Sequence, residues 1–120
     1  MPYVPEQGHA IWLTFDPQAG HEQAGRRPAV VLTPVAYNQK VGLLLTCPVT
    51  TQVKGYPFEV LLPQGLPVSG AALSDQVKSI DWRARRASFI CALPESVLLE
   101  IVAKLFPLLP HGPAVRRPEI

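Results

Sequence analysis

Residues 22–32, EQAGRRPAVVL, lead from a polar segment into an apolar strand. The strand predicted over 28–33 is apolar on both faces, which indicates a central place in a sheet. The segment 42–47, GLLLTC, has the same two-sided apolar character. Another strand is expected over 9–15, and the segment 57–62 is rich in residues that favour strands. These segments predict a sheet with 28–33 and 42–47 near its middle.

The rest of the chain predicts further short strands and one helix. The 14 prolines divide the sequence into short pieces, which favours short strands over long helices. Strands are expected within 70–80 and 86–92, and a short helical turn over 34–38. The helix is expected to begin near Pro94, because proline suits the first helical position and 97–105 carries apolar residues at helical spacing. The predicted fold is mainly β: a small, barrel-like antiparallel sheet with a C-terminal helix.

Composition is typical of one small globular domain. Of the 120 residues, 48% are hydrophobic and 17% are charged, as in compact proteins. We expect a single domain over 1–110 and a flexible extension over 111–120. Without a membrane-spanning apolar run or a signal sequence, the expected location is cytoplasmic. Because the net charge is only +2, binding to nucleic acid would depend on local clusters of charge.

The two cysteines are expected to be buried small hydrophobic residues. Cys47 and Cys91 both stand in apolar segments, and their spacing is not that of metal ligands. We therefore expect neither a metal nor another cofactor.

Pairing of the two central strands would bring an arginine beside a hydroxyl group. If 28–33 and 42–47 pair antiparallel across the connection 34–41, a centred register joins residues whose numbers sum to about 75–77. Arg27 then lies opposite Thr50, within one or two positions. A guanidinium group offers a fixed fork of donors to two phosphate oxygens, and a threonine hydroxyl can donate to a third. Such donors would stabilise the charge that develops on phosphate when a neighbouring 2′-hydroxyl cleaves RNA.

Three blocks of this sequence resemble the MazF (PemK/Kid-like) toxins of bacterial toxin–antitoxin modules. They are residues 22–32, 48–60 (PVTTQVKGYPFEV) and 72–85 (ALSDQVKSIDWRAR), in the family's order. The resemblance implies the fold of that family, which the gyrase poison CcdB shares. It also implies a metal-independent, sequence-specific endoribonuclease that cuts single-stranded mRNA and inhibits translation. The expected products carry a 2′,3′-cyclic phosphate or 3′-phosphate and a 5′-hydroxyl, and the expected partners are a second copy and a MazE-like antitoxin.

The resemblance also implies catalytic residues. The essential arginine of the family precedes the Pro-Ala-Val-Val strand, and its essential Thr or Ser precedes Thr-Gln, positions that match Arg27 and Thr50. Glu22 is expected either to act as the general base or to order Arg27. Many relatives have histidine at the position of Arg26, and His21 is an alternative acid or base. The acid and the base are therefore left unassigned.

Candidate RNA contacts lie in the same three blocks. The basic segment 78–86 is expected to be either an ordinary exposed surface or an edge that binds RNA or the antitoxin. Trp82 within it is either a stacking or partner anchor or a core residue, whereas Trp12 is expected in the core. The expected RNA contacts are His21, Arg26, Thr51, Gln52, Lys54, Lys78, Arg83 and Arg85.

Two other functions are left open. CcdB-like toxins poison DNA gyrase through an aromatic C-terminus, whereas this chain ends RRPEI. A toxin kept only for regulation with its antitoxin is the second alternative, because Arg26 departs from the commoner histidine. The pairing of Arg27 with Thr50 favours the nuclease.

Overall fold

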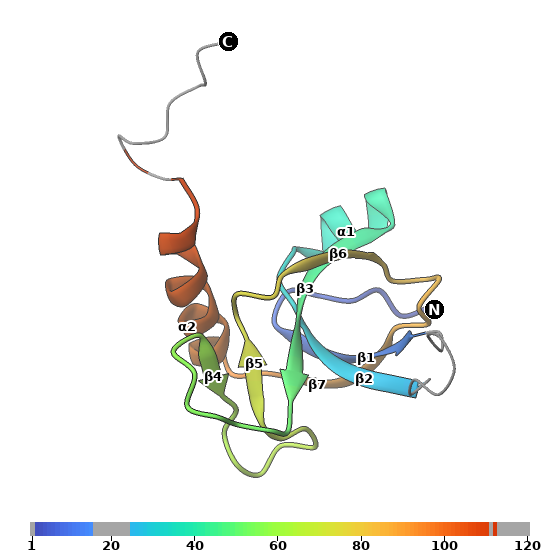
Figure 1. The fold of residues 1–120 in the computed structure, drawn as a ribbon. Coiled ribbons are helices and arrows are strands. Elements are labelled where there is room, and N and C mark those ends of the chain that lie inside the picture. Colours follow the sequence, from blue (N-terminus) through green and yellow to red (C-terminus); the bar gives the residue numbers. More distant parts are fainter. Residues whose placement is uncertain (1, 16–24, 111, 113–120) are drawn as a thin grey trace, which may run out of the picture.

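Seven strands form one antiparallel sheet in the computed structural model, which describes residues 2–15, 25–110 and 112. In chain order the elements are β1 (His9–Phe15), β2 (Gly25–Val31), α1 (Val35–Val41), β3 (Leu43–Thr50), β4 (Glu59–Leu61), β5 (Ala71–Leu73), β6 (Lys78–Asp81), β7 (Ser88–Ala92), α2 (Glu95–Leu105) and a short 3-10 helix, η1 (Phe106–Leu108). Figure 1 shows α2 beside β4 at one end of the molecule and α1 near β6 at the other. The predicted mainly β fold with a C-terminal helix is confirmed.

Strand β3 organises the sheet because three other strands pair with it. Along one edge it pairs with β2, where Val30 lies opposite Cys47. Along its other edge it pairs first with β6 and then, at its C-terminal end, with β5. Beyond these neighbours, β1 pairs with β2, β7 with β1, and β4 with β5. Within the described residues no ladder joins β7 to β4 or β6, so the curled sheet stays open.

The sheet carries a buried layer on each face, which explains the two-sided apolar strands. Val30 belongs to one layer, which Val97 and Ile101 of α2 cover. Its neighbours Ala29 and Val31 belong to the other layer. Successive residues of a strand point to opposite faces, so a strand between two layers must be apolar at every position. The second layer consists of Ile11, Leu13, Ala29, Val31, Leu44, Ile80 and Trp82.

Several predicted boundaries differ from the structure. The range 70–80 contains two strands, β5 and β6, and the helical turn expected over 34–38 is the longer helix α1. Strand β2 begins at Gly25, before the predicted start at residue 28. Helix α2 begins at Glu95 after Pro94, as predicted. Apart from Gly112, the extension expected over 111–120 lies outside the described residues.

The two tryptophans differ in burial. The expectation of a core position for Trp12 is wrong, since its side chain is 37% exposed. Trp12 alternates along β1 with Ile11 and Leu13, which are both buried, so the period of the strand turns it to the opposite face. Trp82 is buried, and its indole N–H donates to the carbonyl of Asn38 at 2.8 Å. The core alternative for Trp82 is therefore confirmed.

The cysteines also differ from each other. Cys47 is fully buried, as expected, and this burial raises the pKa of its thiol to about 12. Cys91 is partly exposed, and desolvation raises its pKa as well. Among the described helices, none has the length and apolar character that crossing a membrane requires.

Candidate active-site groove

The register of β2 and β3 places Arg27 and Thr50 on the same face of the sheet. Ala29 lies opposite Pro48 and Val30 opposite Cys47, pairs whose numbers sum to 77. The same sum joins Arg27 to Thr50, so the predicted register is confirmed. Both side chains line a groove of about 440 Å³.

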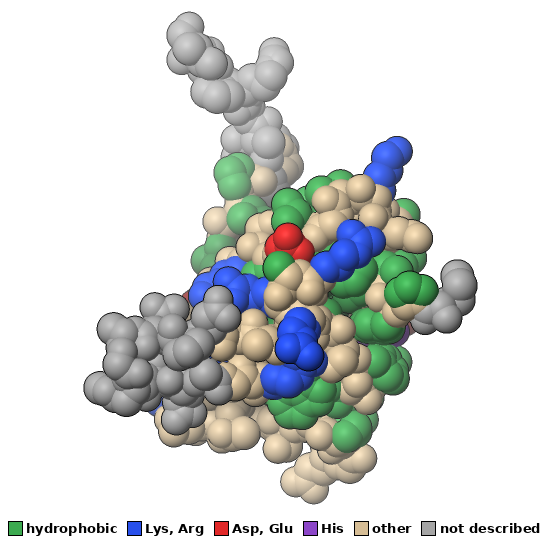
Figure 2. All heavy atoms as spheres, turned by 90° about the vertical axis from the view of Figure 1, so that its right-hand side faces the viewer, with side chains coloured by type: hydrophobic (Ala, Val, Ile, Leu, Met, Phe, Trp, Pro, Cys, Tyr) green, Lys and Arg blue, Asp and Glu red, His purple; other side chains and the backbone are tan. Residues whose placement is uncertain are grey.

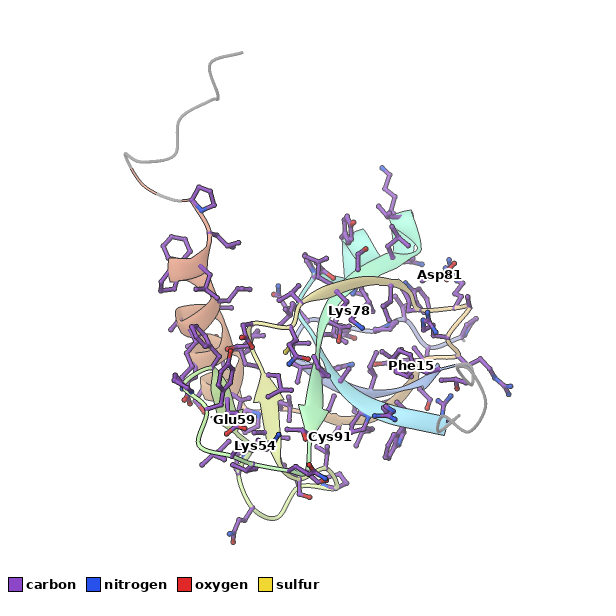
Figure 3. All side chains as sticks on the ribbon, in the orientation of Figure 1. Phe15, Lys54, Glu59, Lys78, Asp81 and Cys91 are labelled. Atoms are coloured by element: carbon purple, nitrogen blue, oxygen red, sulfur yellow. The ribbon has the colours of Figure 1, made fainter. Side chains whose placement is uncertain are left out.

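This groove has an apolar floor and a polar rim. Phe15 and Ile80 contribute to the floor, which continues into the second buried layer of the sheet. Arg27, Thr50 and Lys78 contribute to the rim. Figure 3 shows Phe15 and Lys78 between β6 and the β1–β2 pair. An apolar floor under positive and hydroxyl groups suits a ligand that combines flat apolar rings with phosphates.

A second hollow continues the groove on the far side of Thr50. Leu73 and Gln76, like Thr50, line both hollows. Gln52 and Lys54 line only the second one. We call the first hollow the arginine end of the groove and the second the loop end. Thr50 thus lies at the junction of two stretches that a single extended strand could occupy together.

Contacts from both sides fix Thr50 in place. Its hydroxyl oxygen accepts a hydrogen bond from the backbone N–H of Gln52 at 3.0 Å, which leaves the hydroxyl proton available for donation. Its backbone pairs with Ala71 of β5. Gly70 has φ +112, and a Cβ there would lie 2.0 Å from the carbonyl oxygen of Thr50. Only glycine lets β5 approach Thr50 in this way.

The two neighbouring arginines of β2 have different surroundings. Arg26 donates to the side chain of Thr14, to the carbonyl of Arg86 at 2.7 Å and to the hydroxyl of Ser88 at 2.5 Å. These bonds tie β2 to β1 and β7. Arg27 points to the opposite face, and within the described part of the chain its guanidinium has no hydrogen-bond or ion-pair partner. None of the described residues therefore competes with a ligand in the groove for the Arg27 guanidinium.

The other expected RNA contacts divide between the groove and its surroundings. Lys78 lines the arginine end, and Gln52 and Lys54 line the loop end, whereas Thr51 is exposed but lines neither. Arg83 lies 4.4 Å from the ring of Trp82, and Arg85 lies 4.9 Å from the ring of Phe15; neither of these arginines lines the groove. Figure 2 shows that Lys and Arg predominate among the charged side chains on the side of the molecule that lies at the right of Figure 1. The expectations for His21 and Glu22 lie outside the described residues.

Sequence reasoning missed three residues that shape the groove. Gln76 lines both ends, Gly70 fixes the position of Thr50, and Glu59 is a carboxylate that is only 8% exposed. The sequence signal for Glu59 was an acidic residue at the start of an apolar strand. The signal for Gly70 was a glycine immediately before another strand. Among the described residues, no group of three or more His, Cys, Asp or Glu is placed to hold a metal ion.

Comparisons with known proteins agree with this geometry. A family model described as PemK-like, MazF-like toxin of type II toxin–antitoxin system matches residues 6–109. The endoribonuclease toxin MazF of Escherichia coli strain K12 is 62% identical over 86 residues, which are 72% of this chain and 77% of that protein. The endoribonuclease PemK of Escherichia coli is 36% identical over 104 residues, covering 82% of this chain and 78% of that protein.

The structural comparison gives the same result. A chain in a crystal structure of MazE–MazF from Deinococcus radiodurans matches with a TM-score of 0.86 and 57% sequence identity. The match covers 89% of this chain and 96% of that one. Sequence and fold therefore agree over nearly the whole domain, and the chain belongs to the PemK-like, MazF-like family of type II toxin–antitoxin toxins.

Proposed function

We propose that this protein is the toxin of a type II toxin–antitoxin module and an endoribonuclease that cuts single-stranded mRNA at a short sequence, thereby inhibiting translation. The observation that carries the proposal is the groove in which Arg27, which has no partner among the described residues, lies on the same face as Thr50. The relatives named MazF and PemK are endoribonucleases, which supports this function. The CcdB-like alternative is not favoured, because the matching family is PemK-like and MazF-like and the similar relatives are named endoribonucleases.

The proposed reaction is an internal transesterification of RNA. The 2′-hydroxyl attacks the adjacent phosphorus, the bond to the 5′-oxygen breaks, and the proton lost by the 2′-hydroxyl is balanced by one gained at the 5′-oxygen. The products are a 2′,3′-cyclic phosphate, which water can open to a 3′-phosphate, and a 5′-hydroxyl. Arg27 and Thr50 would donate to the two non-bridging oxygens of the phosphate. Each such donor contributes about 3 kcal/mol when it is already in place.

The proton transfers require groups besides these two. Arg27 remains protonated at any working pH, so it is a poor general base. Glu22 is proposed either as the base or as the carboxylate that orders Arg27, and His21 as an alternative acid or base. Arg26 is an unsuitable replacement for the histidine of relatives, because its guanidinium is committed to β1 and β7.

The groove also suggests how the RNA strand lies. Lys78 at the arginine end and Lys54 at the loop end stand on either side of Thr50 along the rim. Phosphates on both sides of the scissile bond would therefore meet a positive charge, and Gln52 and Gln76 could contact base edges. Local placement of these cations makes such binding compatible with a net charge of only +2.

The proposal extends to partners and location. We propose a cytoplasmic homodimer that acts without a metal or other cofactor. A MazE-like antitoxin would inhibit it by laying an acidic segment along the same groove, where that segment would compete with RNA phosphates for the lysines and Arg27. The toxin–antitoxin complex would bind DNA.

The direct test is to incubate the purified protein with a long single-stranded RNA in EDTA and to map the fragment ends. We expect cuts at a recurring short motif, with 5′-hydroxyl ends. Arg27→Ala should abolish cleavage while the fold persists and antitoxin binding is largely retained through the other groove contacts. Arg27→Lys should restore little cleavage, because lysine keeps the charge but lacks the fork of donors. Lys40→Ala, which removes an exposed cation of α1 outside the groove, is the matched control. Normal cleavage by Arg27→Ala would refute the proposed mechanism.

A further inference from the structure

A buried carboxylate organises the wall of the loop end. Glu59 is the first residue of β4. Its carboxylate accepts backbone hydrogen bonds from Lys54 at 3.0 Å, from Gly55 at 2.9 Å and from Tyr56 at 3.2 Å. Successive N–H groups that converge on one anion form a nest. The conformation of the turn at 54–56 therefore depends on an anion that the chain itself supplies.

Two further side chains hold the same turn. The hydroxyl of Tyr56 donates to the carboxylate of Asp75 at 2.5 Å. From α2, the ammonium of Lys104 donates to the carbonyls of Pro57 and Glu59, at 3.0 Å each, and so holds the chain directly after the turn. The turn is thus fixed by groups from β4 and from the β5–β6 connection, and the C-terminal helix holds the segment that follows it. So many ties on an exposed connection indicate that its exact position has a use.

Lys54 is the residue of this turn whose position matters most for RNA. Its side chain is exposed, lines the loop end together with Thr50, and forms no ion pair within the described residues. Figure 3 shows Lys54 beside Glu59, below the start of α2. Glu59 binds the backbone of the turn, so its charge is satisfied there and the ammonium of Lys54 stays available. A fixed backbone also lowers the conformational entropy that Lys54 loses when it binds a ligand.

We propose that Glu59 is a positioning residue for RNA binding: it fixes the turn at 54–56 so that Lys54 binds a phosphate at the loop end of the groove. The inference rests on the proposed endoribonuclease function and deepens it. Glu59 itself does not contact the RNA, and it acts through the backbone of Lys54.

Glycine substitutions allow a test that leaves the core intact. Gly55 has φ +80 and Gly65 has φ +92, and a Cβ at either position would meet nothing within 4 Å. Alanine at either position therefore introduces similar backbone strain without a clash. Gly55→Ala strains the turn that Glu59 holds, whereas Gly65→Ala strains the turn between β4 and β5. The second variant is a matched control for any general loss of stability.

The measurement is the affinity for an RNA that contains the mapped cleavage site with a single 2′-deoxy substitution, which prevents the cut. Lys54→Ala should weaken binding about tenfold, as expected for one charged hydrogen bond. It should also reduce the slope of log affinity against log salt by about 0.7, the value for one phosphate contact to a single strand. Gly55→Ala and Glu59→Gln should each reproduce both effects, and Gly65→Ala should reproduce neither.

The double variant decides the question. If Glu59 and Gly55 act through Lys54, then Gly55→Ala should weaken binding no further in a Lys54→Ala background. Additive losses, or equal losses for Gly55→Ala and Gly65→Ala, would overturn the inference. Should Glu59→Gln fail to fold, the Gly55 and Lys54 variants still distinguish these outcomes. Wild-type protein that leaves RNA uncut would instead refute the proposed function, so the two failures are distinguishable.

Discussion

Replacing Gly70 by alanine should separate the placement of the Thr50 hydroxyl, which we propose to be catalytic, from the chemistry of that hydroxyl. Gly70 contributes no functional group, yet its backbone lies against Thr50. An alanine Cβ would lie 2.0 Å from the carbonyl oxygen of Thr50 and 2.8 Å from its carbonyl carbon. Both contacts are to backbone, so no flexible side chain can move aside.

The magnitude follows from this geometry. Real Cβ contacts essentially never fall under 3.0 Å, so β5 and Thr50 must separate by about 1 Å or more for alanine to fit. A displacement of that size at a reacting group costs about 100-fold in rate. The positive φ of +112 adds strain for any residue with a Cβ, which lowers the free energy of unfolding by about 1–3 kcal/mol.

The assay is single-turnover cleavage of an RNA with one mapped site, at a temperature where circular dichroism shows the variant folded. We expect the rate of the chemical step for Gly70→Ala to fall about 100-fold. Gly65→Ala has similar backbone strain with no atom within 4 Å of its Cβ, so it should cleave at the wild-type rate. A folded Gly70→Ala variant that cleaves as fast as wild type would refute the reasoning, because Thr50 would then tolerate displacement.

Two further predictions concern residues outside the groove. Arg26→Ala should lower the free energy of unfolding by about 1–2 kcal/mol, since it removes the ties from β2 to Arg86 and Ser88; a loss of cleavage with unchanged denaturant unfolding would contradict this structural role. Burial raises the pKa of Cys47 from 9.0 to about 12, so the folded state holds this proton more tightly than the unfolded state. Its contribution to stability is then present below pH 9 and lost as the pH rises toward 12. In a Cys91→Ala background, a thiol reagent should modify Cys47 only as fast as the protein unfolds, and rapid modification of the native protein would contradict its burial.

The centre of the sheet is well predicted from the sequence because the signal there is local. Two strands that are apolar on both faces must lie between two buried layers, and the short connection 34–41 constrains their register. These two facts are enough to place Arg27 opposite Thr50. The observed pairs, such as Val30 with Cys47, have the same register.

Other features depend on contacts between distant residues. Side chains alternate between the two faces of a strand, so Trp12 lies on the face opposite the buried Ile11 and Leu13. The prediction of a core position for Trp12 depended instead on its being an aromatic residue in the middle of a strand. The alternation of side chains also predicts that Arg26 and Arg27 lie on opposite faces of the sheet. Only the structure shows that Arg26 donates hydrogen bonds to Arg86 and Ser88. Such partners, sixty or more positions away in sequence, have no local pattern to reveal them.

The location of the groove has a simple origin in how β3 changes partners. Along one edge, β3 pairs with β6 as far as Thr46 opposite Lys78, and with β5 only from Val49 onward. The ladder is broken between these pairs, at Cys47 and Pro48. The chain that joins β5 to β6 supplies Gln76 to the groove that opens there.

A break inside a sheet usually leaves a backbone donor without a partner, and Pro48 avoids this. The carbonyl of Leu45 accepts a hydrogen bond from the N–H of Leu32, so Leu45 directs its backbone groups toward β2. Successive residues of an antiparallel strand direct these groups to alternate edges, and Pro48 therefore faces the broken edge. Because proline has no N–H, the ladder can stop there at little cost. Two residues later the strand presents Thr50, so the hydroxyl proposed for catalysis lies on a sheet strand where the two ends of the groove meet.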